Sequence, residues 1–150
     1  MVRVQEADFD LGAEVAAMTE GRSDIGAVAT FTGLVRDFAA DKGAAMTLEH
    51  YPGMTEKALA EVEAEAAGRW PLAASLVIHR VGRLVPGDRI VLVATASVHR
   101  RAAFDAAEFL MDYLKTRAPF WKKEEGPAGG AWVEARASDA EAAARWARRG

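Results

Sequence analysis

The chain has 150 residues, a length that suits a single domain spanning residues 1–150. Hydrophobic residues make up 51% and charged residues 27% of it, a balance typical of a globular protein. A net charge of -3 argues against a nucleic-acid partner, and the absence of cysteine excludes disulfides, a thiolate nucleophile and a Cys-ligated metal. No apolar run approaches the ~18 residues that span a bilayer. The N-terminus lacks the apolar core of a signal peptide, so we expect a cytoplasmic protein without membrane contact.

The first elements are two strands with a helix between them. Residues 2–5 predict a short strand, and Asp10 can cap a helix over residues 10–19. Residues 26–35 are rich in β-branched and apolar side chains, which predicts the second strand. A loop over residues 37–45 follows.

The middle of the chain contains the two strongest strand predictions. A strand over residues 46–51 leads into an alanine- and glutamate-rich helix over 55–67, which Gly68 is expected to end. Residues 72–80 and 89–97 then predict two strands, and the Pro-Gly-Asp turn between them indicates a hairpin or near-hairpin.

The last third alternates between helices and extended segments. Ser97 can cap a helix that runs to about Arg117, and Pro119 forces an extended segment through Trp121. Residues 132–135 predict a last strand, before a terminal helix capped by Ser138 or Asp139. Helices and strands are interspersed, but the two strongest strands are tightly joined. The pattern therefore predicts an α+β fold with a largely antiparallel sheet.

Cationic side chains gather where a strand meets a helix, at His99, Arg100 and Arg101. Helix N-termini present unpaired N–H groups and the positive end of the helix dipole, so they bind anions readily. Cations at this end of a helix destabilise it, because their charge opposes the dipole, and a bound phosphate would offset that destabilisation. The alternative is a solvated helix start.

A second cationic group surrounds the segment after this helix and contains Lys115, Lys122 and Lys123. On a helical wheel, Lys115 lies at the margin of an apolar stripe that comprises Phe104, Ala107, Met111 and Leu114. A lysine against an apolar surface tends to have a lowered pKa, which suits proton transfer or covalent attack. The alternatives are a snorkelling lysine and a solvated strand end.

Other patterns carry less information. Arg36 closes a strong strand and could reach a cleft, but surface arginines are common there. The three histidines lie far apart in the sequence without metal-ligand spacing, so we expect no metal. Walker, GxGxxG and nucleophile-elbow motifs are absent.

Several motifs follow one another along residues 26–136. They are Phe31-Thr-Gly-Leu-Val-Arg36, Leu48-Glu-His-Tyr-Pro-Gly-Met54, His79-Arg-Val-Gly82 with Gly87-Asp88, Val98-His-Arg-Arg-Ala-Ala-Phe104, Met111-Asp-Tyr-Leu-Lys115 and Pro119-Phe-Trp-Lys-Lys-Glu124. Together, and in this order, they resemble the motifs of the large, catalytic subunit of molybdopterin synthase. The chain departs from the family pattern at Ala107, often cysteine there, and at Phe120, where isoleucine is common.

The resemblance implies an α/β-hammerhead fold and a sulfur-transfer reaction in molybdenum-cofactor biosynthesis. Two large subunits would form a homodimer within a heterotetramer. Each would bind a small ubiquitin-like subunit whose C-terminal Gly-Gly carries a thiocarboxylate. The substrate would be cyclic pyranopterin monophosphate and the product molybdopterin, with no resident cofactor. The missing cysteine agrees with this, since the partner brings the sulfur.

The resemblance also implies roles for individual residues. Lys115 and Lys122 match the catalytic lysines. The phosphate and pterin site would contain Arg36, His99 and Arg100. Further substrate-binding or supporting positions are Leu34, Val35, Lys123, Glu124, Arg136, Phe31 and Met111.

Two alternatives from other classes remain. One is a non-catalytic module that binds a phosphorylated pterin or a ubiquitin-like tail, and the other is a structural domain without a site. The pair Lys115 and Lys122 argues against the module, because a protein that only binds needs no buried lysine pair.

Arg100 and Lys115 would lie at opposite ends of one helix, roughly 22 Å apart along its axis. We therefore expect a site shared by two chains, with Arg136 as the first candidate to cross and Arg100 as the second.

Overall fold

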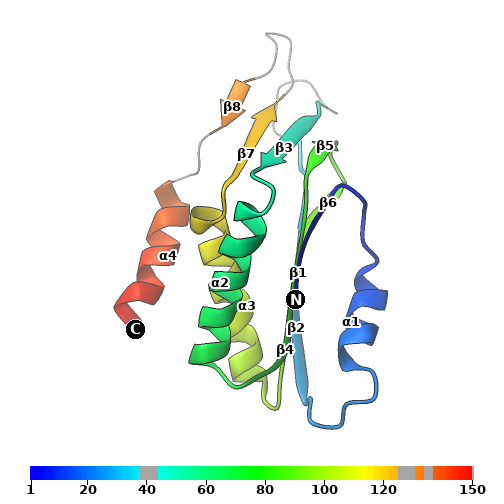
Figure 1. Ribbon diagram of the computed structural model, residues 1–150, viewed down its shortest axis with the longest axis vertical. Helices are drawn as coiled ribbons and strands as arrows, with labels where there is room; N and C mark the ends of the chain where they lie inside the picture. The colour runs from blue at the N-terminus through cyan, green and yellow to red at the C-terminus, as the bar shows by residue number, and fades with distance from the viewer. Residues whose placement is uncertain (38–43, 125–130, 134–136, 150) are drawn as a thin grey trace.

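The computed structural model describes residues 1–37, 44–124, 131–133 and 137–149 (Figure 1). Within these residues the elements, in chain order, are β1 (Val2–Gln5), α1 (Leu11–Thr19), β2 (Ala27–Leu34), β3 (Met46–His50), α2 (Met54–Arg69), β4 (Leu72–Arg80), β5 (Gly82–Leu84), β6 (Arg89–Ser97), α3 (Arg100–Arg117), β7 (Phe120–Glu124), β8 (Ala131–Val133) and α4 (Ala137–Arg149). The α+β prediction is confirmed, and the strands over 72–80 and 89–97 have the predicted bounds.

The strands form two sheets where the sequence pattern indicated one. The first has the order β1-β4-β6-β2, with β1 parallel to β4 and the other pairs antiparallel. The second has the order β5-β3-β7-β8 and is antiparallel throughout. The near-hairpin between β4 and β6 exists, but its connection contributes β5 to the second sheet. Gly82, with a φ of 90°, lies at this change of sheet, in a conformation that favours glycine.

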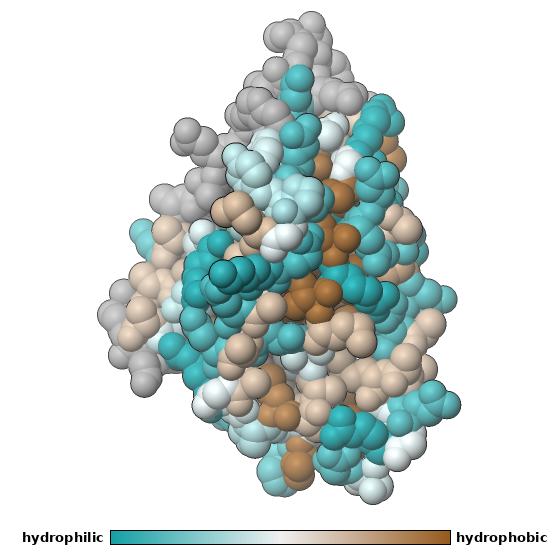
Figure 2. Space-filling model, in the orientation of Figure 1, coloured by the Kyte–Doolittle hydropathy of each residue, from teal (hydrophilic) through white to brown (hydrophobic). Residues whose placement is uncertain are grey.

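Two layers of helices cover the first sheet. α2 and α3 lie on one face and α1 on the other (Figure 1). Each face of this sheet has its own hydrophobic core, because side chains alternate along β4. Val77 points to the α2–α3 side, whereas Leu76 and Ile78 point to α1. The largest fully buried side chain of the α2–α3 core is Phe109. In Figure 2, hydrophobic residues emerge as a narrow band between hydrophilic surfaces.

The start of α3 differs from the prediction. Its N-cap is His99, without a side-chain cap bond, whereas Ser97 is the buried last residue of β6. The Ser97 hydroxyl donates a hydrogen bond to the Pro71 carbonyl at 2.8 Å, so it is not available to cap the helix.

Two other helix boundaries were predicted wrongly. Gly68 does not end α2, which continues through Arg69, because the next residue, Trp70, caps the helix with its backbone N–H. α4 begins at Ala137, so Ser138 and Asp139 lie inside its first turn.

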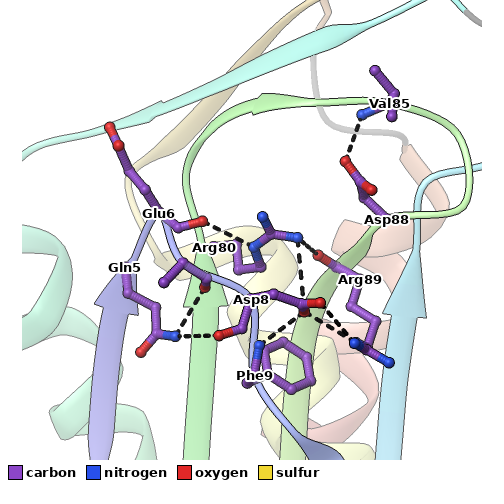
Figure 3. Close-up of polar contacts among 9 residues, drawn as sticks. Gln5, Glu6, Asp8, Phe9, Arg80, Val85, Asp88 and Arg89 are labelled. Carbon is purple, nitrogen blue, oxygen red and sulfur yellow. Dashed lines mark hydrogen bonds and ion pairs between the residues drawn. The ribbon is translucent and has the colours of Figure 1, made fainter.

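A polar network ties the segment after β1 to the ends of β4 and β6 (Figure 3). Arg89 donates two hydrogen bonds to the Asp8 carboxylate, at 3.0 and 2.6 Å. This pairing lowers the pKa of Asp8 to about 2. The Arg80 side chain donates to the carbonyls of Glu6 and Arg89, at 3.1 and 2.9 Å. The network therefore holds Arg80 in place next to the cavity described below.

Candidate active site

A cavity of about 690 Å³ lies where the two sheets and the C-terminal half of α3 meet. β2, β3, β4, β6 and β7 all contribute to its wall. The lining residues are Phe31, Thr32, Gly33, Leu34, Val35, Arg36, Met46, Leu48, His79, Ile90, Val91, Met111, Leu114, Lys115, Ala118, Phe120, Trp121, Lys122 and Glu124. This size suits a small organic ligand.

Three cations line the cavity from three different parts of the chain. Arg36 lies two residues after β2, Lys115 lies in the last turn of α3, and Lys122 lies on β7. Local periodicity places the two lysines. On α3, Met111 and Lys115 are one turn apart and share a face, and on β7 alternation directs Lys122 inward while Lys123 is exposed. Three cations around one cavity can bind an anionic group and stabilise negative charge that develops in a reaction.

The exposure of Lys115 differs from the expectation of a buried lysine pair. Lys115 lines the cavity but is exposed, whereas Lys122 is half-buried. Lys115 therefore projects from the apolar wall of the cavity, where Leu114 beside it is buried.

An aromatic group forms one wall of the cavity. The rings of Phe120 and His79 stack, with centroids 3.8 Å apart and an interplanar angle of 18°. His50 lies 6.4 Å from Phe120, and Trp121 packs against Tyr51 at 4.7 Å. Phe120, one of the two departures from the family pattern, is therefore part of the site. A flat apolar wall of this kind suits the face of a planar ring.

His79 is the buried titratable group of the cavity. It is 6% exposed, and its Nδ1 lies 2.8 Å from the Arg80 carbonyl. Burial lowers the pKa of His79 to about 4; the bond to the Arg80 carbonyl opposes this shift, and electrostatic interactions with Lys115 and His50 add to it. Sequence reasoning assigned His79 no role, although it shares the inward-facing parity of Val77 along β4.

Most of the residues assigned by resemblance meet at the cavity. Its lining includes Lys115, Lys122, Leu34, Val35, Arg36, Glu124, Phe31 and Met111. Lys123 does not line it, and Arg136 lies outside the described residues.

The cations at the start of α3 do not reach the cavity of their own chain. His99 and Arg100 are exposed and are not among the lining residues. Phe104, predicted to belong to the apolar stripe of α3, is 63% exposed, whereas Ala103 and Ala106 in the same part of the helix are buried. A single chain thus holds only part of the predicted phosphate site.

Among the residues described, no cluster of three or more His, Asp or Glu side chains could hold a metal ion. No helix in the described ranges is both long and apolar enough to cross a membrane.

Comparison with known proteins decides the family. The sequence pattern of the MoaE protein family matches residues 4–117, which is most of the chain. The chain belongs to the MoaE protein family. The molybdopterin synthase catalytic subunit of Ralstonia nicotianae is 62% identical over 146 residues, covering 97% of this chain and 83% of the relative. That of Escherichia coli (strain K12) is 59% identical over 139 residues, covering 92% of both chains.

Solved structures of the MoaE family agree with this fold. A molybdopterin biosynthesis MoaE protein from Burkholderia ambifaria has a TM-score of 0.85 at 57% identity, covering 98% of this chain and 97% of that one. A molybdopterin synthase structure from Staphylococcus aureus has a TM-score of 0.80 at 32% identity, covering 88% and 96%. The predicted family and fold class are confirmed, as is the prediction that this chain is an enzyme subunit.

Proposed function

We propose that this MoaE-family chain transfers sulfur onto cyclic pyranopterin monophosphate, producing the dithiolene of molybdopterin. The sulfur comes from the C-terminal thiocarboxylate of a small ubiquitin-like subunit, and residues 1–150 act as one catalytic domain in the cytoplasm. The observation that carries the proposal is the cavity itself. It places Arg36, Lys115 and Lys122 around a space of about 690 Å³ in a chain whose relatives are molybdopterin synthase catalytic subunits.

The lysines act on the reacting groups. Lys115 transfers a proton, or forms a transient covalent bond, as the thiocarboxylate attacks the substrate. Lys122 stabilises the negative charge that develops and binds the carboxyl group of the tail. Phe120 and Trp121 form a wall beside the path of the tail, whose glycines are narrow enough for its carbonyl to approach the lysines.

The phosphate site implied by the resemblance includes cations that one chain does not bring to its own cavity. Arg36 lines the cavity, but Arg100 begins α3 while Lys115 lies in its last turn. Fifteen residues of helix separate their backbones by roughly 22 Å. We assign His99 and Arg100 to the cavity of a second copy of the chain, across a two-fold interface.

The surface next to the cavity supports a second copy. β2 is an edge strand of its sheet and packs against α3. Together the two elements expose four large hydrophobic side chains: Val28, Phe31, Leu34 and Phe104. Exposed apolar side chains gathered on two adjoining elements indicate a protein–protein interface.

The experiment is reconstitution from purified parts. The chain is incubated with cyclic pyranopterin monophosphate and the thiocarboxylated small subunit, and molybdopterin is measured. Lys115→Ala and Lys122→Ala are each expected to reduce the rate by ~10²–10⁴. Lys57→Ala, at an exposed position on α2, is the matched control and should retain the wild-type rate. Binding without product in the wild type would identify a non-catalytic module and contradict the proposal.

A further inference from the structure

His79 is a buried polar group of the cavity that the proposed sulfur chemistry does not use. It lies at the end of β4 and is 6% exposed, yet it is one of the cavity-lining residues. A polar side chain buried to this degree normally has its hydrogen-bonding atoms satisfied. The two ring nitrogens of His79 differ in this respect.

The tautomer of His79 follows from its partner. Nδ1 lies 2.8 Å from the carbonyl oxygen of Arg80, which can only accept, so Nδ1 carries the proton. The backbone of Arg80 is held in turn, because its side chain donates to the carbonyls of Glu6 and Arg89 (Figure 3). Stacking on Phe120 fixes the plane of the imidazole. Nε2 is therefore a lone-pair acceptor in a fixed position, and no donor within the described ranges is bonded to it.

The cavity has a buried floor and an exposed rim. Its buried members include Met46, Leu48 and His79, whereas Arg36 and Lys115 are exposed. A phosphorylated planar ring matches this division, because the anionic phosphate favours the cations at the rim and the ring face favours the apolar floor. The edge of such a ring then meets the neutral acceptor of His79.

We propose that Nε2 of His79 accepts a hydrogen bond from an N–H on the edge of the pterin ring, with the ring on the cavity floor and its phosphate at the rim near Arg36. This assignment rests on the proposed function, and it makes His79 a substrate-positioning residue. The low pKa of His79 agrees with this role, because the ring stays neutral at neutral pH and Nε2 continues to accept.

Two substitutions test the roles of the two His79 ring nitrogens separately. In His79→Asn the shorter amide can still donate to the Arg80 carbonyl in place of Nδ1, but nothing replaces Nε2. In His79→Gln the amide oxygen reaches the position of Nε2 and can accept there. The affinity for cyclic pyranopterin monophosphate is measured by calorimetry without the small subunit. We expect about 10- to 30-fold weaker binding for His79→Asn, because a buried ligand N–H is left unpaired. His79→Gln should recover part of the loss.

A spectroscopic measurement on the wild type separates this proposal from a purely structural role. The chain has three histidines, so the ¹⁵N signal of His79 can be assigned. Adding the substrate alone should shift the ¹⁵N resonance of Nε2 toward the range of a hydrogen-bonded acceptor and leave the resonance of Nδ1 unchanged. Equal affinity of His79→Asn and wild type would overturn the inference, as would a shift of Nε2 that appears only with the small-subunit tail.

The outcomes also distinguish this inference from the function on which it rests. Normal molybdopterin synthesis by the wild type, together with unaltered substrate affinity in His79→Asn, would refute the role of His79 and leave the function intact. Failure of the wild type to bind or convert the substrate would overturn both. Thermal melting of each variant confirms that the comparison is made between folded proteins.

Discussion

Lowering the pH from 7 to 5 should destabilise this protein through His79. In the folded chain burial lowers the pKa of His79 to about 4, whereas in the unfolded chain the pKa returns to 6.5. Between these two values the unfolded chain binds more protons than the folded one. The free energy of unfolding therefore falls as the pH drops through this window, and His79 contributes its full stabilisation only above pH 6.5.

The size of the effect follows from the two pKa values. At pH 5 the unfolded ring is almost fully protonated while the folded ring is mostly neutral. The linked loss of stability is ~2 kcal/mol relative to pH 7. This is a measurable part of the total stability of a domain, which is commonly ~5–15 kcal/mol. The other large shift, that of Asp8, acts at lower pH, because its pKa falls from 3.8 to about 2.

The assay is urea unfolding at pH 7 and pH 5, followed by circular dichroism at one fixed protein concentration. Fixed concentration matters because association of subunits also stabilises the folded state. His79→Asn is the control, since asparagine can retain the bond to the Arg80 carbonyl and does not titrate. The wild type should lose ~2 kcal/mol more than the variant between the two pH values. An equal loss in both proteins would refute the assignment of a buried, neutral His79.

Three further predictions concern the shared site, the partner and the core. Lys115→Ala subunits and Arg100→Ala subunits are each expected to be inactive alone. Mixing them should restore partial molybdopterin synthesis, because the mixed dimer contains one intact site. No recovery after confirmed subunit exchange would place both residues in one chain's site. A small subunit without its last two glycines should not support catalysis, and normal sulfur transfer from it would contradict entry of the tail into the cavity. Trp146→Ala should lower the free energy of unfolding by about 3–5 kcal/mol, measured by urea unfolding, because Trp146 is 3% exposed and packs edge-on against Trp70 and Phe109. Trp146→Phe should cost less, and equal losses would show that ring packing is not the cause.

Local patterns in the sequence determined the individual elements and the family. The predicted bounds of β4, β6 and the end of α3 agree with the structure, because each has a strong period and a clear stop signal. The order of the motifs indicated the family, which the comparisons confirm. Lys115, Lys122 and Arg36 could be assigned because each stands at a fixed place in such a motif, and the structure brings all three to one cavity.

Only the tertiary structure decided which distant groups meet. Ser97 has a side chain that commonly caps helices, but the fold places the Pro71 carbonyl next to its hydroxyl, which donates a hydrogen bond to that carbonyl instead. His79 and Phe120 are 41 residues apart in the sequence, and their stacking depends on how the second sheet packs against the first. The same packing buries His79 and lowers its pKa. His99 and Arg100 lie at the start of α3, and the length of that helix keeps them from their own chain's cavity. Periodicity reports which face of an element is apolar, whereas the partner across that face depends on contacts between distant parts of the chain.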